Sequence, residues 1–178
     1  MVGAPDTWLE ILARLGAAAV LGGVIGWDRE IKGRAAGLRT HMLVALGAAA
    51  FIVTGLQIIE GMAVQSQVQF DPMRVVQGIA GGIGFLGAGA IIQSGGKVKG
   101  LTTAAGMWTC AAMGLAAGAG LYQTAFIVTA LCLVILTVLG WVEPLPRPNG
   151  TSEKPIDSPA QASDSAGAQE SPSEGSSK

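Results

Sequence analysis

Three long stretches of this chain contain no Asp, Glu, Lys or Arg, and they limit the fold more than any other feature. They are residues 40–59, 75–96 and 100–142, which are 20, 22 and 43 residues long. A helix needs about 20 predominantly apolar residues to cross the hydrocarbon core of a bilayer. We therefore predict one membrane crossing in each of the first two stretches, and two crossings in the third, joined by a tight turn near Gly118 and Gly120.

A fifth, less apolar candidate precedes these stretches and contains Glu10 and Arg14. Their spacing of four residues lets the two side chains pair on one helix face, and we expect Arg14 to extend toward the outer head groups as an anchor. An outer gate or a partner contact is the alternative. The predicted fold class is all-α, a polytopic membrane protein with five transmembrane helices. The predicted spans are residues 9–27, 41–59, 75–93, 101–119 and 123–142.

The composition changes abruptly after Val142. Residues 1–142 carry eight basic and six acidic side chains, a net charge of +2, whereas residues 143–178 carry three and six, a net charge of −3. Six of the eight prolines lie in the second part, which has too few apolar side chains to offset the entropy of ordering. We predict a transmembrane domain over residues 1–142 and a disordered cytoplasmic tail over residues 143–178. These charge counts exclude a strongly basic nucleic-acid binder.

Basic residues indicate the orientation of the predicted spans. Four of them lie in the connection over residues 28–40, two more are Lys97 and Lys99, and the connection over residues 60–74 has only Arg74. Cytoplasmic connections carry the excess of Lys and Arg. We therefore place the N-terminus outside and the C-terminus in the cytoplasm, and five spans require this separation of the two ends.

Small residues recur at every fourth position in several predicted spans. In the fourth span they include Gly106, Cys110 and Gly114. This spacing places small residues on one helix face, where two backbones can approach closely. We interpret the pattern as packing within one bundle, with the weakly hydrophobic fourth span as its central helix. A homo-oligomer and a solute path along spans three and four are the alternatives.

The third span contains a run of glycines that includes Gly82, Gly84, Gly87 and Gly89. Its first part matches G-x-G-x-x-G, but a dinucleotide site also needs a preceding strand and an acidic residue about 20 positions further on. We discard that interpretation because residue 102 is threonine and the run lies in a stretch of membrane length. Repeated glycine lowers helix propensity, so we expect close helix contact or local unwinding here.

Polar side chains gather around the two predicted cytoplasmic connections. Spans two and four both begin there, so their free N–H groups face the cytoplasm, a setting that favours anions. Anchoring of the membrane edge accounts for the basic residues but not for the Thr and His residues beside them. We predict a cytoplasmic polar cluster of Arg29, Glu30, Arg39, Thr40, His41, Thr102 and Thr103.

Three motifs occur in a fixed order along the predicted spans. They are GWDRE and AGLRTHMLV at 26–30 and 36–44, DPMRV and GIGFLGAG at 71–75 and 82–89, and GLTTAA at 100–105. Together they resemble the MgtC/SapB family of bacterial inner-membrane proteins over about residues 9–142. Many members of that family carry an ACT-like cytoplasmic domain after the last span, which residues 143–178 do not resemble.

The resemblance implies a multi-pass protein of the bacterial inner (plasma) membrane, linked to growth under magnesium limitation and, in pathogens, to survival inside host cells. We expect no enzymatic activity, because the sequence offers no constellation of nucleophile, base and metal ligands. We also expect no cofactor and no metal site. Mg²⁺ is held mainly by carboxylates, and those of residues 1–142 all lie near predicted membrane edges.

Two hypotheses for the function follow. The leading one is a regulator that acts on a membrane partner, such as a transporter or an ATPase, through the cytoplasmic polar cluster. Arg29 and Arg39 would bind an anionic group or a partner carboxylate, and Glu30 would orient an arginine. The other hypothesis is a channel or transporter for Mg²⁺ or another solute, with its path along the glycine-rich spans three and four.

Overall fold

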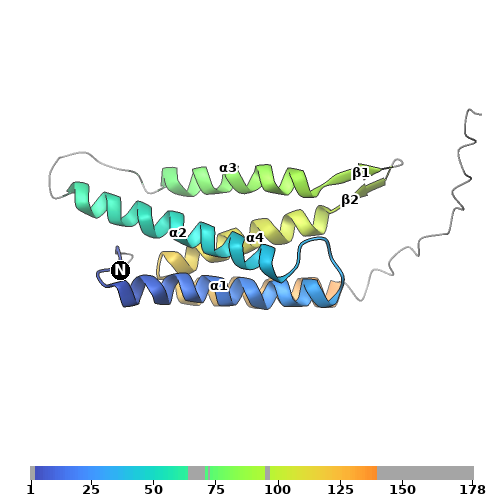
Figure 1. Ribbon diagram of the computed structural model, residues 1–178, viewed down its shortest axis with the longest axis horizontal. Coiled ribbons are helices and arrows are strands. Elements are labelled where there is room, and N and C mark those ends of the chain that lie inside the picture. The colour runs from blue at the N-terminus through green and yellow to red at the C-terminus, as the bar shows by residue number, and fades with distance from the viewer. Residues whose placement is uncertain (1–2, 64–70, 72, 95–96, 140–178) are drawn as a thin grey trace, which may run out of the picture. The chain divides into compact units, whose positions relative to one another are not determined.

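Five α-helices make up most of the described chain (Figure 1). The computed structural model describes residues 3–63, 71, 73–94 and 97–139, so the predicted C-terminal tail lies outside the described residues. The helices are α1 (Trp8–Ile31), α2 (Leu38–Ala63), α3 (Met73–Ala90), α4 (Leu101–Gly118) and α5 (Tyr122–Val134), and α5 continues into a short π-helix, η1 (Ile135–Leu139).

The prediction of five helices is confirmed, and each of them overlaps one predicted span. Two of the described helices, Trp8–Ile31 and Leu38–Met62, are long and apolar enough to cross a membrane by length and composition. The other three do not meet that criterion, so five crossings stay a prediction. The turn expected near Gly118 and Gly120 separates α4 from α5, and Gly120 adopts a φ of +79° there.

The predicted end of the third span, at residue 93, is wrong. Helix α3 ends at Ala90, and the next residues form a two-stranded antiparallel hairpin of β1 (Ile92–Ser94) and β2 (Lys97–Lys99), with Ile92 opposite Lys99. A Cβ on Gly100, which has a φ of +90°, would collide with the Ala90 carbonyl, so glycine lets the chain return close to α3. Local unwinding is also wrong, because α3 is helical throughout the glycine run.

Helix α4 contacts all four other helices, as expected of a central helix. Its small residues allow this. A Cβ on Gly118 would lie 2.7 Å from the Ala49 Cα atom, and one on Gly114 would collide with the Ala45 carbonyl oxygen. Helices α1 and α2 meet equally closely, since a Cβ on Gly26 would lie 2.8 Å from the Leu38 Cα atom. Helices α1, α2 and α4 therefore form the tightly packed core of the bundle, and α3 lies on the side away from α1 (Figure 1).

Arg14 is buried at the end of the bundle that holds Gly3 and Gly118, and its extension to the outer head groups stays a prediction. It pairs with Glu10 as expected, with 2.5 Å between Nη2 and Oε1. Its Nη1 atom donates to the carbonyl oxygens of Gly118, at 3.1 Å, and of Gly3, at 3.0 Å. The last carbonyls of a helix lack intrahelical partners and attract a cation. Arg14 therefore ties α1 to the C-terminal end of α4.

Candidate functional site

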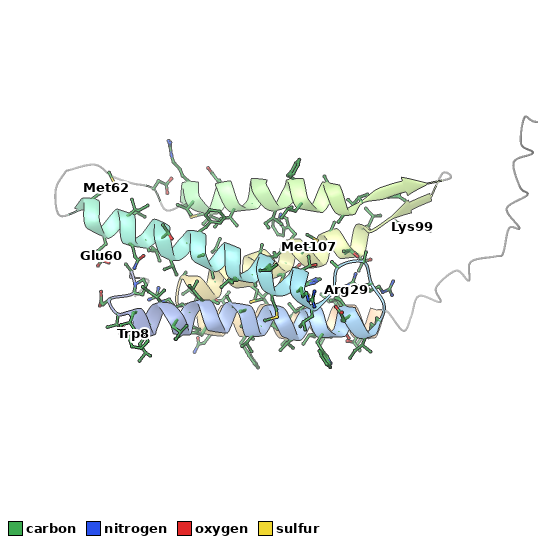
Figure 2. All side chains as sticks on the ribbon, viewed as in Figure 1. Trp8, Arg29, Glu60, Met62, Lys99 and Met107 are labelled. Carbon is green, nitrogen blue, oxygen red and sulfur yellow. The ribbon has the colours of Figure 1, made fainter. Side chains whose placement is uncertain are left out.

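A buried hydrogen bond joins the end of α1 to the start of α4. Arg29 lies in the last turn of α1 and is 3% exposed, and its Nη2 atom donates to the Thr103 hydroxyl at 2.8 Å. Thr103 lies in the first turn of α4 and is itself 5% exposed. Figure 2 shows Arg29 and Lys99 labelled at the same end of the bundle, opposite the end that holds Trp8 and Glu60. Arg29 and Thr103 from the predicted cluster thus meet in the interior at this end.

The imidazole of His41 is tightly packed near the Arg29–Thr103 hydrogen bond. Its side chain is fully buried, and Nδ1 lies 2.9 Å from the Gly37 carbonyl oxygen. Because a carbonyl only accepts, Nδ1 carries the hydrogen, which leaves Nε2 as an acceptor. Within the described residues Nε2 has no hydrogen-bond partner. A Cβ on Gly106 would lie 3.6 Å from Nε2, and the Cys110 thiol donates to the His41 carbonyl at 3.3 Å.

Glu30 binds backbone rather than an arginine, which corrects its predicted role. Its Oε2 atom accepts a hydrogen bond from the Leu38 N–H at 2.8 Å, at the start of α2. The first N–H groups of a helix have no intrahelical partner, and a carboxylate there is also favoured by the helix dipole. Gly37 makes this contact possible, because a Cβ at that position would collide with the carboxylate. Glu30 therefore fixes how the chain enters α2.

The remaining members of the predicted cluster lie nearer the surface. Arg39 and Thr102 are exposed, and Thr40 is partly buried. Within the described residues, their side chains make no hydrogen bond or ion pair with the rest of the chain. The predicted cluster therefore divides into an interior group of Arg29, His41 and Thr103, and a surface group of Arg39, Thr40 and Thr102.

Sequence reasoning missed one ion pair at the same end of the bundle. The Lys32 Nζ atom lies 2.7 Å from the Asp28 carboxylate and 3.5 Å from the Leu136 carbonyl oxygen in η1. The spacing of four residues between Asp28 and Lys32 was the available signal. Among the residues that the structure describes, no three His, Cys, Asp or Glu side chains gather as metal ligands would.

The predicted small-residue positions do not face one another across α3 and α4. Gly106 and Gly114 of α4 approach His41 and Ala45 of α2. Of the α3 glycines, only Gly87 approaches α4, where a Cβ would lie 3.6 Å from the Ala104 Cβ atom. A Cβ would meet open space at the other α3 positions singled out from the sequence, Gly82, Gly84 and Gly89.

Comparison with known sequences identifies the family. The model of the MgtC family matches residues 15–145. The chain is 36% identical to YhiD of Escherichia coli K12 over 129 residues, which are 72% of this chain and 60% of that protein. It is 35% identical to SapB of Bacillus subtilis over 148 residues, 83% of this chain and 64% of that protein. It is 43% identical to MgtC of Brucella abortus strain 2308 over 127 residues, 71% of this chain and 50% of that protein.

The chain therefore spans between half and two thirds of the length of these relatives. No solved structure matches it. The family model covers most of the bundle described above, including the buried group of Arg29, His41 and Thr103. On this match, the chain belongs to the MgtC family.

Proposed function

We propose that this chain is a non-enzymatic, multi-pass protein of the bacterial inner membrane that supports growth under magnesium limitation by regulating a membrane partner. A transporter or an ATPase is the kind of partner we expect. The N-terminus lies outside and the C-terminus lies in the cytoplasm, so the surface group of Arg39, Thr40 and Thr102 faces the cytoplasm. Support for the link to magnesium comes from relatives, one of which has a name that refers to magnesium transport.

The packing of the bundle interior is the observation that carries this proposal. Between the buried Arg14 and Arg29, the core helices meet through small apolar side chains, of which Ala18, Ala45 and Cys110 have no exposed surface. Transporters place ionisable side chains or broken helices near the membrane midplane. Here the buried guanidinium groups lie toward opposite ends of the bundle. His41 is buried beside Gly106 near the Arg29 end, and small apolar side chains such as Ala18 fill the rest of the space between the two arginines. This arrangement favours a protein that acts through its ends over one that conducts an ion through its interior.

The buried Arg29–Thr103 bond supports a docking role for the cytoplasmic end. It fixes the end of α1 against the start of α4, while Thr102, the neighbour of Thr103, remains exposed. A partner that contacts Thr102 and Arg39 would therefore meet a surface with a fixed shape. Preorganisation of this kind lowers the entropic cost of binding.

A transporter is the second candidate, since the name of one relative refers to magnesium transport. The geometry gives it less support, because Gly106 and Gly114 of α4 approach α2, and of the α3 glycines only Gly87 approaches α4. The space between α3 and α4 is a pocket of about 90 Å³, and its lining is apolar except for the indole of Trp108. A path along these helices would leave a dehydrated cation almost without ligands.

Two measurements test the proposal. Liposomes that contain only the purified protein should show no Mg²⁺ flux above empty liposomes, and flux above that level would overturn the regulator. A photo-crosslinking amino acid at position 102 should capture a defined transporter or ATPase from cells grown in low Mg²⁺. The same amino acid at position 60, which is exposed at the opposite end, is the matched control. Equal capture from both positions would contradict a cytoplasmic docking face.

A further inference from the structure

A deep apolar groove runs between α2 and α3. Its volume is about 620 Å³, and all of its lining residues are apolar or glycine. Val44 and Ala48 form its floor and are at most 9% exposed, whereas Leu43 and Phe51 stand at its rim and are 67% and 68% exposed. The groove arises because α3 packs on α4 and touches α2 over only a short distance.

The groove is closed at one end and open at the other. A Cβ on Gly55 would lie 3.1 Å from the Val75 side chain, so the two helices touch there. From this contact they diverge toward the hairpin end of the bundle (Figure 1). The lining runs from Leu43 to Phe51 on α2 and from Val75 to Leu86 on α3, about 12 and 16 Å at the rise of an α-helix. One leaflet of a bilayer has a hydrocarbon layer of about 15 Å.

A free cation stands at the open end of the groove. Arg39 precedes the rim residue Leu43 by four residues, so the two are neighbours on the surface of α2, one turn beyond the end of the lining. Helical side chains lean toward the N-terminus of their helix, so the Arg39 guanidinium lies beyond the apolar wall. Arg39 is exposed and makes no hydrogen bond or ion pair with any described residue.

We propose that the α2–α3 groove binds an acyl chain of an anionic phospholipid whose phosphate lies against Arg39. An apolar channel one leaflet deep with a cation at its mouth matches both parts of such a lipid. In the orientation proposed above, that mouth faces the cytoplasmic leaflet, where basic side chains between helices bind anionic head groups. The inference uses this orientation but does not depend on the regulatory role.

The cation near the groove favours a lipid over a helix from a second copy. Arg39 has no partner among the described residues, and a lipid phosphate supplies an anion that an apolar helix does not. An acyl chain can lie against the floor formed by Val44 and Ala48.

Native mass spectrometry of the purified full-length protein tests the proposal. Phosphatidylglycerol and phosphatidylcholine with identical acyl chains are titrated separately, and sn-glycerol 3-phosphate serves as a head group without chains. We expect one phosphatidylglycerol to bind at least fivefold more tightly than phosphatidylcholine. Arg39→Gln should weaken phosphatidylglycerol about fivefold, as expected for one basic side chain near a head group. Arg74→Gln, an exposed arginine at the other end of α3, should have no effect.

Filling the groove tests the acyl chain separately. A Cβ on Gly82 meets nothing within 4 Å, so the side chain of Gly82→Leu starts in open space at the groove wall. We expect this variant to lose the bound phosphatidylglycerol, because the leucine takes the space that the acyl chain would fill and removes its packing contacts. Gly84→Leu is the matched control, because Gly84 also has open space around it but does not line the groove. Circular dichroism of each variant verifies that the helices are intact.

Four results would overturn the proposal. The first is equal binding of the two phospholipids with no effect of Arg39→Gln, because the head group would then play no part. The second is retention of phosphatidylglycerol by Gly82→Leu, which would place the lipid elsewhere. The third is displacement of the lipid by glycerol phosphate alone, which would identify a phosphate site. The fourth is a dimer that Gly82→Leu dissociates in the absence of lipid, which would identify a self-association surface.

Discussion

Replacing Thr103 with valine should destabilise the bundle by about 2 kcal/mol, because it leaves the buried Arg29 guanidinium without its acceptor. Valine keeps the shape of threonine, and Arg29 and Thr103 are each at most 5% exposed. The substitution therefore removes mainly the 2.8 Å hydrogen bond between them. Hydrogen bonds to charged groups contribute about 1.5–3 kcal/mol, and an unpaired buried donor adds to the cost. Reversible unfolding in mixed micelles, followed by circular dichroism, measures the free energy.

A double-mutant cycle isolates this bond from general effects of the substitution. In an Arg29→Met background no guanidinium remains to be left unpaired, so Thr103→Val should cost less than about 0.5 kcal/mol. Thr109→Val is the matched control on the same helix, because the Thr109 hydroxyl donates at 2.9 Å to the Ala105 carbonyl of its own helix. An equal cost of Thr103→Val in both backgrounds would refute the reasoning.

Three further substitutions test other contacts, each by the same unfolding measurement. Gly114→Val should destabilise the bundle by at least about 2 kcal/mol, because the valine side chain would overlap the backbone of α2. In the control Gly84→Val the new side chain meets open space, so stability should change by less than about 1 kcal/mol. Equal costs of the two substitutions would contradict the close approach of α4 to α2. Arg14→Met should cost about 1–3 kcal/mol by leaving the last carbonyl of α4 unpaired, and an unchanged stability would argue against that tie. Glu30→Ala should cost about 1 kcal/mol through loss of a helix cap, and Glu60→Ala, which removes an exposed carboxylate, should cost less.

The positions of α2, α3, α4 and α5 followed from the charge-free stretches, because a membrane-spanning helix lies in a continuous apolar segment, and α1 was found as a less apolar segment that contains Glu10 and Arg14. The hairpin after α3 was missed because the same rule extended the span through Ile92 and Gln93. The Gly95–Gly96 pair between two short segments with β-branched residues was the competing signal, and the absence of charge outweighed it. An apolar run alone does not distinguish the end of a helix from a short strand.

The sequence predicted at which end of the bundle the residues of the candidate site lie, but not which side chains contact one another. Placing both predicted cytoplasmic connections on one side correctly put Arg29 and Thr103 near the same end of the bundle. Which arginine turns inward depends on the rotation of α1 and α2 about their axes, and sequence spacing alone does not set that rotation. The same limit explains Arg14, whose pair with Glu10 was visible as a local spacing, whereas its contact with Gly118 is 104 residues away in the chain.

The central position of α4 has a consequence for the order in which the protein is made. Arg14, Arg29 and His41 in the first two helices contact α4 residues that lie 104, 74 and 69 positions further along the chain. At the usual rate of bacterial or eukaryotic synthesis, that distance corresponds to a delay of about 4–20 s. During this interval Arg29 lacks its Thr103 acceptor, and Arg14 has its Glu10 partner within α1 but not its carbonyl acceptor in α4. Nascent chains of this family should therefore depend on the insertion machinery until the fourth helix is released.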